Sequence, residues 1–333
     1  MKRVLSGIQP TGHLHLGNYL GAMRHWVELQ NTHECLFCVV DLHAVTIPQD
    51  PHTLRHSTRL TTAAYLAAGI NPQTASLFVQ SHVAAHSELS WLLSCFTPLG
   101  WLNRMTQFKE KSKNRDTAGL GLYAYPVLMA ADILVYKTTH VPVGADQKQH
   151  LELARDVAGL VNRHYNVEFF TPPEPLILGE ATRVMSLRDG TAKMSKSDPS
   201  EFSRIGLMDS ADIIAQKVRK AKTDSEPLPG MIADLEHRPE AKNLVTILAA
   251  LQDRTSADIC REMEGMLFSR FKQILTDTLV EKIVPIGRRM QELMGNPDYL
   301  DTILHQGAVK ALSIADTTMA ELREIMGFLH RAK

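Results

Sequence analysis

Apolar and amphipathic segments alternate along roughly the first half of the chain. Short apolar runs have the length of buried strands, and the amphipathic stretches between them have the periodicity of helices packed on one face. The expected strands lie at residues 4–7, 35–40, 76–80 and 141–144. The expected helices lie at residues 18–30, 52–68, 124–136 and 146–165. This alternation predicts βαβ units around a parallel sheet, and therefore an α/β fold.

The alternation ends at a proline-rich stretch that contains Pro172, Pro173 and Pro175. Beyond about residue 200 we find no strand pattern, only helical segments at residues 209–221, 241–252, 256–292, 297–312 and 316–330. We expect Pro285 to break the third of these, because proline removes a helix hydrogen bond. The pattern thus predicts a sheet domain over residues 1–200 and a C-terminal helical domain over residues 201–333.

Composition places the chain among soluble globular proteins. Of its 333 residues, 44% are apolar and 22% are charged. No run approaches the roughly 18 apolar residues that suggest a membrane span, and the start MKRVLSGIQP has no apolar signal segment behind its basic residues. We therefore expect a cytoplasmic protein without a membrane partner. The 36 basic residues equal the 36 acidic ones, so net charge neither supports nor excludes a nucleic-acid partner.

Cysteine spacing gives no support for a metal site. Cys35 and Cys38 are three residues apart, but structural zinc sites usually need a second pair of ligands at similar spacing, and none is present. The two cysteines lie in the strand-like run ECLFCVVD, where positions three apart point to opposite faces. We expect buried, reduced thiols and no bound metal.

The segment GIQPTGHLHLGN at residues 7–18 directly follows the first expected strand. Its glycines and Pro10 favour a tight turn, and the helix that follows directs free backbone N–H groups toward a place that suits phosphate. His15 and Asn18 add neutral hydrogen-bond donors. A plain turn with a surface histidine explains the same residues. The spacing fits neither GxGxxG nor the P-loop.

A second candidate is KMSKS at residues 193–197, inside the polar loop RDGTAKMSKSDPS. Two lysines among small hydroxyl residues form a cationic segment that suits a leaving pyrophosphate, where negative charge grows during the reaction. Taken alone, a basic serine-rich loop is also typical of solvated surface.

In this order and about 180 residues apart, the two segments resemble the HIGH-like and KMSKS signatures of class I aminoacyl-tRNA synthetases. Other segments make the chain similar to the bacterial tryptophanyl-tRNA synthetase family: VVDLHA (39–44), RMTQFKEK (104–111), YPVLMAADIL (125–134) and VPVGADQKQHLELARD (141–156). The helical remainder matches more loosely, at TDSE (223–226) and KNLVTIL (242–248).

The resemblance implies a Rossmann-like catalytic domain that includes the KMSKS loop, a helical anticodon-binding region, and a homodimer. It implies an enzyme that activates L-tryptophan with ATP to tryptophanyl-adenylate and transfers the acyl group to tRNA(Trp), with Mg2+ carried by ATP. The implied ATP-contacting residues are Gln9, Pro10, Thr11, His15, Gly17, Asn18, Gly144, Ala145, Asp146, Val184, Lys193, Met194, Ser195, Lys196 and Ser197. The implied catalytic residues are Lys111, Lys193, Lys196 and Ser197.

Two positions depart from the family pattern. The family usually has GEDQ where this chain has Gly144-Ala145-Asp146-Gln147, which puts any role of the missing carboxylate in doubt. Position 15, often threonine in bacterial members, is His15 here, and a histidine is compatible with a phosphate contact.

The amino-acid pocket is expected on one face of the segment YPVLMAADILVY, where helical spacing aligns Tyr125, Met129, Asp132 and Tyr136. Burying the lone carboxylate of Asp132 is costly unless a donor bonds to it, and the indole N–H is such a donor. Local pairing within the fold is the alternative explanation. The resemblance favours Asp132 as the indole reader. It also implies Tyr125 and Gln147 as binders of the substrate's ammonium and carboxylate, and Met129, Val141 and Val143 as walls of the pocket.

Three other interpretations remain open at this point. A tyrosine-specific synthetase shares the signatures, but Asp132 and the QPTG form of the first segment argue against it. A small nucleotidyltransferase of the same superfamily has little need of the long helical region. A non-catalytic paralogue that binds tryptophan is favoured only by Ala145, and the intact KMSKS loop opposes it.

Overall fold

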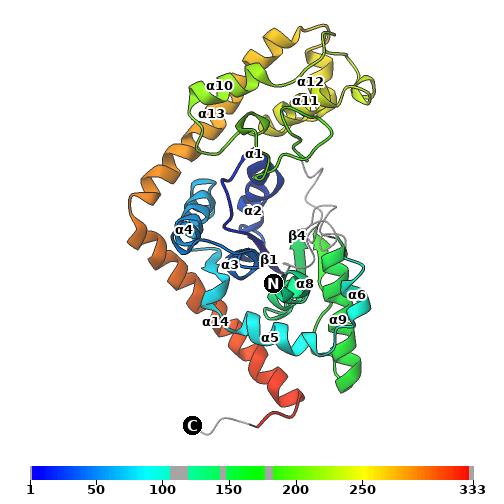
Figure 1. Cartoon of the computed structure of the whole chain (residues 1–333), viewed down its shortest axis with the longest axis vertical. Helices are drawn as coiled ribbons and strands as arrows, with labels where there is room; N and C mark the ends of the chain where they lie inside the picture. Colours follow the sequence, from blue (N-terminus) through cyan, green and yellow to red (C-terminus); the bar gives the residue numbers. More distant parts are fainter. Residues whose placement is uncertain (1, 106–118, 143–147, 177–182, 330–333) are drawn as a thin grey trace.

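The computed structural model describes residues 2–105, 119–142, 148–176 and 183–329. Within them a five-stranded parallel sheet has the order β3-β2-β1-β4-β5 (Figure 1). The strands are β1 (Arg3–Ile8), β2 (Glu34–Val39), β3 (Ser76–Val79), β4 (His140–Pro142) and β5 (Glu174–Leu176). The α/β prediction and the four expected strands are confirmed. β5 was not expected because it contains Pro175, but it is an edge strand, where a missing N–H is tolerated.

Helices join the strands and cover the sheet. The expected ones are present as α1 (Leu16–Asn18), the π-helix η1 (Tyr19–Met23), α2 (Arg24–Leu29), α4 (Pro51–Ala67), α8 (Leu120–Leu134) and α9 (Lys148–Tyr165). The sequence pattern did not predict α3 (Asp41–Ala44), the 3-10 turn η2 (Gln80–His82), α5 (Ala85–Ser94) or α6 (Leu99–Leu102). Most of these are too short to show a periodicity.

The second half of the described chain is mainly helical. Its helices are α10 (Ala211–Lys220), α11 (Pro239–Leu251), α12 (Ser256–Glu262), α13 (Phe268–Met294) and α14 (Pro297–Ile325). The predicted break at Pro285 is wrong, because α13 runs through it and the break falls before α13, near Gly265. Pro285 lies on the exposed side of α13, where water can satisfy the carbonyl that the proline leaves free.

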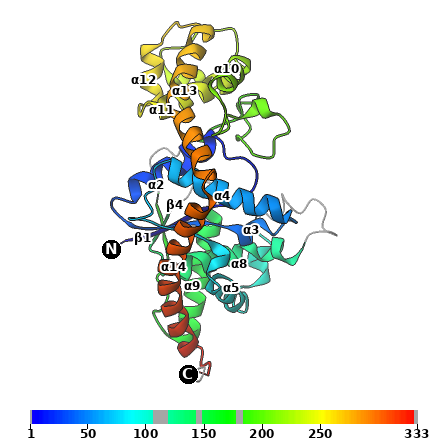
Figure 2. The same cartoon turned by 90° about the vertical axis from the view of Figure 1, so that its left-hand side faces the viewer.

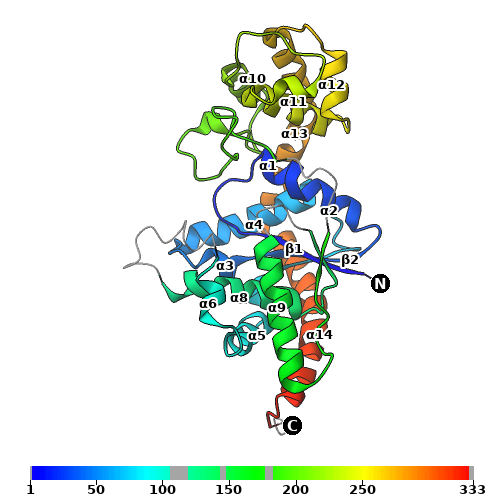
Figure 3. The same cartoon turned by 90° about the vertical axis from the view of Figure 1, so that its right-hand side faces the viewer.

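The predicted division of the last segment into two helices is also wrong. Residues 297–325 form the single helix α14, which follows α13 and runs alongside the sheet domain, away from helices α10 to α12 (Figures 2 and 3). It contacts β3 more extensively than any other pair of elements in the described chain contact each other. Because β3 is an edge strand, α14 covers backbone groups that would otherwise be open.

The core consists of two main apolar clusters, and β2 contributes to both. Cys35 belongs to the cluster that contains Trp26 and Phe37, whose rings stack at 5.0 Å, and Cys38 belongs to the other. The two thiols therefore lie on opposite faces of the sheet, as predicted. Burial raises the pKa of the Cys35 thiol to about 12 and that of Cys38 well above its usual range. In the described part of the chain, none of the helices is long and apolar enough to cross a membrane.

Candidate active site

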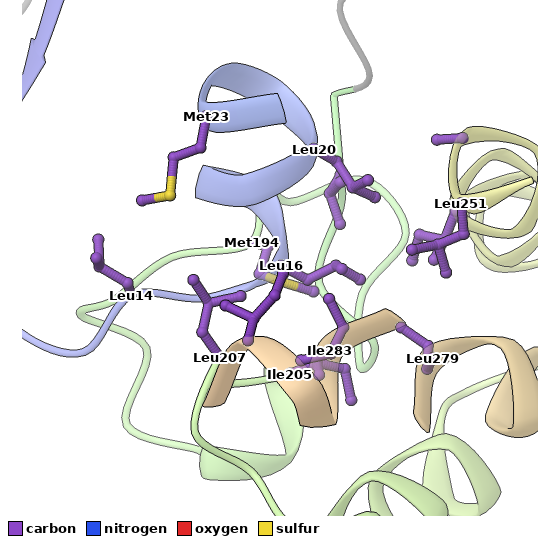
Figure 4. Close-up of a cluster of buried hydrophobic side chains, with 14 of the residues drawn as sticks. Leu14, Leu16, Leu20, Met23, Met194, Ile205, Leu207, Leu251, Leu279 and Ile283 are labelled. Carbon is purple, nitrogen blue, oxygen red and sulfur yellow. The ribbon is translucent and has the colours of Figure 1, made fainter. Parts of the chain in front are cut away.

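The structure brings together the two signature segments that lie far apart in the sequence. The Leu16 N–H donates to the carbonyl of Ile205 at 2.8 Å, and the Leu207 N–H donates to the carbonyl of Leu14 at 3.0 Å. Figure 4 shows Leu16 beside Met194, the methionine of KMSKS, in one buried cluster with Ile205. The methionine thus holds the loop in the core, whereas Lys193 and Ser197 are exposed and Ser195 and Lys196 are half-buried.

Lys196 lies against the turn that follows β1. Its Nζ donates to the carbonyl oxygens of Thr11 at 2.8 Å and Gln9 at 3.4 Å. Gly12, whose φ is +61°, faces the stem of this lysine, and a side chain there would be strained. Burial lowers the pKa of Lys196 to about 8. The lysine is therefore a weakly solvated cation beside the candidate phosphate site.

His15 caps the helix that follows the turn. Its Nδ1 accepts the N–H of Gly17 at 3.1 Å, and its own backbone N–H donates to Oδ1 of Asn18 at 3.1 Å. Burial, followed by the charges of Lys196, Arg204 and Lys193, lowers the pKa of His15 to about 4. At neutral pH the imidazole is therefore uncharged, and because Nδ1 accepts, Nε2 carries the proton and remains a donor.

Asp132 is buried at the carboxyl end of the sheet, with 5% of its surface exposed. Oδ1 accepts from Nε2 of Gln80 at 2.7 Å and from Nδ1 of His86 at 2.6 Å, and Oδ2 accepts from Nε2 of His43 at 2.7 Å. Burial acts to raise the pKa of Asp132, but the charge interactions and hydrogen bonds with His43 and His86 outweigh it and lower the pKa to about 2. The site thus holds an ionised acceptor.

Asp132 lies in α8, and several other residues of the expected pocket lie on or next to this helix. Tyr125 is buried in α8, and its hydroxyl is 2.9 Å from Nε2 of His150, a residue of α9. Its ring also lies edge-on to His43, with ring centroids 6.3 Å apart. Met129 is partly buried in α8, and Val141 is buried in β4. Tyr136 is linked to Asp132 through His86, because its hydroxyl lies 2.7 Å from Nε2 of that histidine.

Three residues of this polar cluster had no role in the sequence-based prediction: His43, Gln80 and His86. His43 and Gln80 follow the carboxyl ends of β2 and β3, which is where ligands bind in open parallel sheets. His43 and Gln80 could have been predicted as site residues by applying this rule to VVDLHA and to the polar residues after the third strand.

The remaining predicted residues fall into three groups: residues at the junction of the two segments, residues of the KMSKS loop, and residues that the structure does not describe. Pro10, Gly17, Asn18 and Val184 lie around the junction of the two segments, where the Met194 N–H donates to the carbonyl of Val184 at 3.0 Å. In the KMSKS loop the hydroxyls of Ser195 and Ser197 are 2.9 Å apart, and Lys193 pairs with Met185 in a β-bridge. The residues that lie outside the described part of the chain are Lys111, Val143, Gly144, Ala145, Asp146 and Gln147.

Comparison with known proteins defines the class to which this site belongs. The family model described as tRNA synthetases class I (W and Y) matches residues 1–278, so the chain belongs to that class of synthetases. The tryptophan–tRNA ligase of Caulobacter vibrioides is 55% identical over 328 residues, covering 98% of this chain and 95% of that protein. The enzyme of the same name from Rhizobium meliloti is 53% identical over 98% of each chain. Within the class, the chain is a member of the tryptophan–tRNA ligase family.

Solved structures agree with this placement. The tryptophanyl-tRNA synthetase of Mycoplasma pneumoniae superimposes with a TM-score of 0.90 at 34% identity, over 99% of this chain and 98% of that one. The Campylobacter jejuni synthetase complexed with ADP and tryptophan gives a TM-score of 0.82 at 36% identity, over 98% of this chain and 100% of that one. The resemblance identified from the sequence motifs is confirmed.

Proposed function

We propose that this protein joins L-tryptophan to tRNA(Trp) in two steps, with ATP as the energy source. Membership of the tryptophan–tRNA ligase family supports the overall reaction, and the Campylobacter jejuni relative was solved with ADP and tryptophan. The structural observation that carries the proposal is the contact of Lys196 with the turn after β1, a few residues from neutral His15. This arrangement offers a cation and a neutral donor to one polyphosphate.

In the first step a carboxylate oxygen of tryptophan attacks the α-phosphorus of ATP, and the bond to the bridging oxygen of pyrophosphate breaks. The leaving pyrophosphate takes the electron pair, so negative charge grows next to Lys196, Lys193 and Ser197. Lys111 is proposed to reach the phosphates from its own segment. Mg2+ is proposed to arrive with ATP, because this ion usually keeps several waters and is bound largely through substrate phosphates. In the second step the terminal ribose hydroxyl of the tRNA takes the acyl group and AMP leaves.

The proposed ATP-contacting set extends around this centre. It comprises Gln9, Pro10, Thr11, His15, Gly17, Asn18, Gly144, Ala145, Asp146, Val184, Met194 and Ser195, together with the lysines and Ser197. His15 suits this role because its Nε2–H points no formal charge at the phosphates, yet still donates a hydrogen bond.

We propose that Asp132 reads the indole N–H. An ionised carboxylate has about four acceptor positions, and the described residues occupy three of those of Asp132, two at Oδ1 and one at Oδ2. One acceptor position therefore remains at Oδ2. Tyr125 and Gln147 are proposed to bind the ammonium and carboxylate of the substrate. Met129, Val141 and Val143 are proposed as the apolar walls.

Pyrophosphate exchange with tryptophan, tyrosine and phenylalanine tests this proposal. A site that hydrogen-bonds a substrate group can reject analogues that lack this group by about 10,000-fold or more. We therefore expect a strong preference for tryptophan over tyrosine and phenylalanine. Asp132→Ala is expected to raise the KM for tryptophan steeply, to reduce the preference, and to leave the KM for ATP within a few-fold. A variant that keeps the preference would make Asp132 a structural carboxylate. Exchange with tyrosine alone would favour the tyrosine-specific alternative, and no exchange with any amino acid would favour a binding paralogue.

The helical region over residues 201–333 is proposed to bind the anticodon end of the tRNA. Helices α10, α11 and α12 lie at one end of the elongated molecule, and α5 lies toward the other end (Figure 1). A tRNA likewise carries its anticodon far from its acceptor end. A fragment that ends near residue 205 is a poor test, because it also removes α14 from the edge of β3. The protein is proposed to act in the cytoplasm, where its substrates ATP and tRNA meet.

We also propose a homodimer. Large apolar side chains are exposed on α5, on α6, at the start of α8 and after α3, namely Trp91, Leu99, Leu120, Val45 and Ile47. These elements are neighbours, since α8 contacts both α5 and α6, and Gly121 lies next to Thr46. Large exposed apolar side chains on neighbouring elements indicate an interaction surface. Two of the elements that form this patch, α5 and α8, also carry His86 and Asp132.

A further inference from the structure

The hydrogen bonds around Asp132 continue beyond its direct partners into a buried chain of polar groups. His86 bonds to Asp132 through Nδ1 and to the Tyr136 hydroxyl through Nε2. His86 and Tyr136 are both fully buried. The Tyr136 ring packs edge-on against Phe78 with centroids 5.7 Å apart. A polar chain in such a place is costly unless each member is satisfied.

The geometry fixes the direction of each hydrogen bond in this chain. Burial raises the pKa of Tyr136, so its hydroxyl stays protonated. Because Asp132 is an acceptor, Nδ1 of His86 must carry a proton, and a neutral imidazole then has Nε2 as acceptor for the Tyr136 O–H. Tyr136 thus holds His86 in the tautomer that donates to Asp132.

Gln80 is oriented in a comparable way. Its Oε1 accepts the N–H of Leu42 at 3.1 Å, so its amide N–H₂ is the group that faces Asp132, at 2.7 Å. Both acceptor positions of Oδ1 are therefore filled by donors whose orientation other groups fix. With Oδ1 held by two donors, the carboxylate plane cannot rotate without breaking one of these hydrogen bonds.

We propose that His86, oriented by Tyr136, is a positioning residue for amino-acid selection, which holds Oδ1 of Asp132 so that Oδ2 keeps one acceptor position for the substrate N–H. This inference rests on the proposed role of Asp132 as the indole reader. Without His86 the carboxylate turns, and His43 can bond to either oxygen. The unoccupied acceptor position then has no fixed direction, and an N–H on the substrate brings less advantage.

The experiment compares tryptophan with β-(3-benzothienyl)alanine, in which sulfur replaces the indole N–H and the ring shape is kept. The readout is the ratio of kcat/KM in pyrophosphate exchange for the two amino acids. His86→Leu is expected to lower this ratio by at least about tenfold, mainly through the KM for tryptophan, with the KM for ATP unchanged within about twofold, in line with one weakened hydrogen bond to a charged group.

Two matched variants separate positioning from a general loss of structure. His86→Asn keeps an N–H donor near the place of Nδ1 and is expected to recover most of the ratio. Tyr136→Phe keeps the ring but removes the proton that fixes the tautomer, and is expected to lower the ratio several-fold. Tyr136→Phe also serves as the test if His86→Leu does not fold.

Asp132→Asn provides the reference that distinguishes the two possible failures. If it lowers the ratio, adding His86→Leu to it should cause little further loss, because coupled residues are non-additive. A wild-type ratio in His86→Leu or in Tyr136→Phe, with a reduced ratio in Asp132→Asn, would overturn the positioning role alone. A wild-type ratio in Asp132→Asn would overturn the indole-reading role on which this inference depends.

Discussion

Among single residues, Lys196 is proposed to contact the phosphates of ATP, although its side chain is already partly desolvated in the free protein. Because burial lowers its pKa to about 8, the free enzyme loses this cation as the pH rises through that value. We expect kcat/KM for ATP in pyrophosphate exchange to fall above about pH 8. The phosphates of bound ATP favour the charged lysine, so kcat at saturating ATP should hold to a higher pH. A pH profile of both quantities measures the difference.

Substitutions of Lys196 make this assignment specific. Arginine stays charged throughout the accessible pH range, so Lys196→Arg should remove the decline of kcat/KM above about pH 8, even if its overall rate is lower. A decline caused by the ammonium group of the substrate tryptophan would instead be the same in both enzymes. Lys196→Ala should slow adenylate formation on the order of a hundredfold, as for one lost electrostatic contact, with tryptophan affinity nearly unchanged. An identical decline in wild type and Lys196→Arg would assign it to another group.

The residues of the site also show how far the sequence leads. Helical spacing predicted that Asp132 and Tyr136 share a face of the segment YPVLMAADILVY. Tyr136 lies two residues beyond the end of α8, and His86 does connect the two side chains. The identity of the connecting groups was not predictable, because Gln80, His86 and His43 come from segments that only the strand order brings to α8. KMSKS and the turn after β1 were linked only through the family resemblance. The contact of Lys196 with Thr11 depends on folding over a long sequence separation.

At the scale of elements, α14 approaches β3 more closely than side chains usually permit. A methyl group on Gly307 would overlap the carbonyl oxygen of Leu77. Alanine favours helices over glycine by about 0.5–1 kcal/mol, so propensity alone predicts that Gly307→Ala stabilises the protein. Overpacking a close contact costs about 1–3 kcal/mol, and we expect this steric cost, which is the larger of the two effects, to decide the sign. The urea midpoint should fall while the slope of the transition stays the same.

Gly100 in α6 provides the matched control. Among the residues that the structure describes, none outside its own helical turn comes within 4 Å of the position that its Cβ would occupy, so Gly100→Ala should leave the urea midpoint unchanged or raise it. Equal midpoints for Gly307→Ala and wild type would mean that α14 can move away from β3 without loss of stability.

The sequence-based prediction was wrong for elements in which tertiary packing overrides a local sequence rule. Proline ends most helices and strands, but Pro285 lies on the exposed side of α13 and Pro175 lies in an edge strand. The period of α14 continues across residues 313–315, where the pattern suggested two helices, because the helix follows the sheet domain for its whole length. Long, strongly periodic elements such as α4 and α9 were predicted within a few residues.

At the scale of the whole molecule, the proposed dimer surface and the active site share their supporting elements. α8 carries Asp132 and begins at the exposed Leu120, and α5 carries both His86 and the exposed Trp91. A partner that covers this patch would therefore contact the outer sides of the two helices whose inner sides hold the polar cluster.

The proposed dimer can be tested by placing charges in the apolar patch, with an exposed apolar residue outside the patch as the control. Trp91 is 70% exposed and Leu99 is 68% exposed, and burying one aromatic side chain of about 150–250 Å² at about 25 cal/mol per Å² contributes several kcal/mol per subunit. We expect the wild-type protein to sediment as a dimer at micromolar concentration, and Trp91→Glu with Leu99→Glu to sediment as a monomer. Met231, 66% exposed in the helical region, supplies the control. Met231→Glu should remain dimeric, because the charge lies outside the patch. A double variant that stays dimeric, or a monomeric wild type, would place the partner surface elsewhere or remove it.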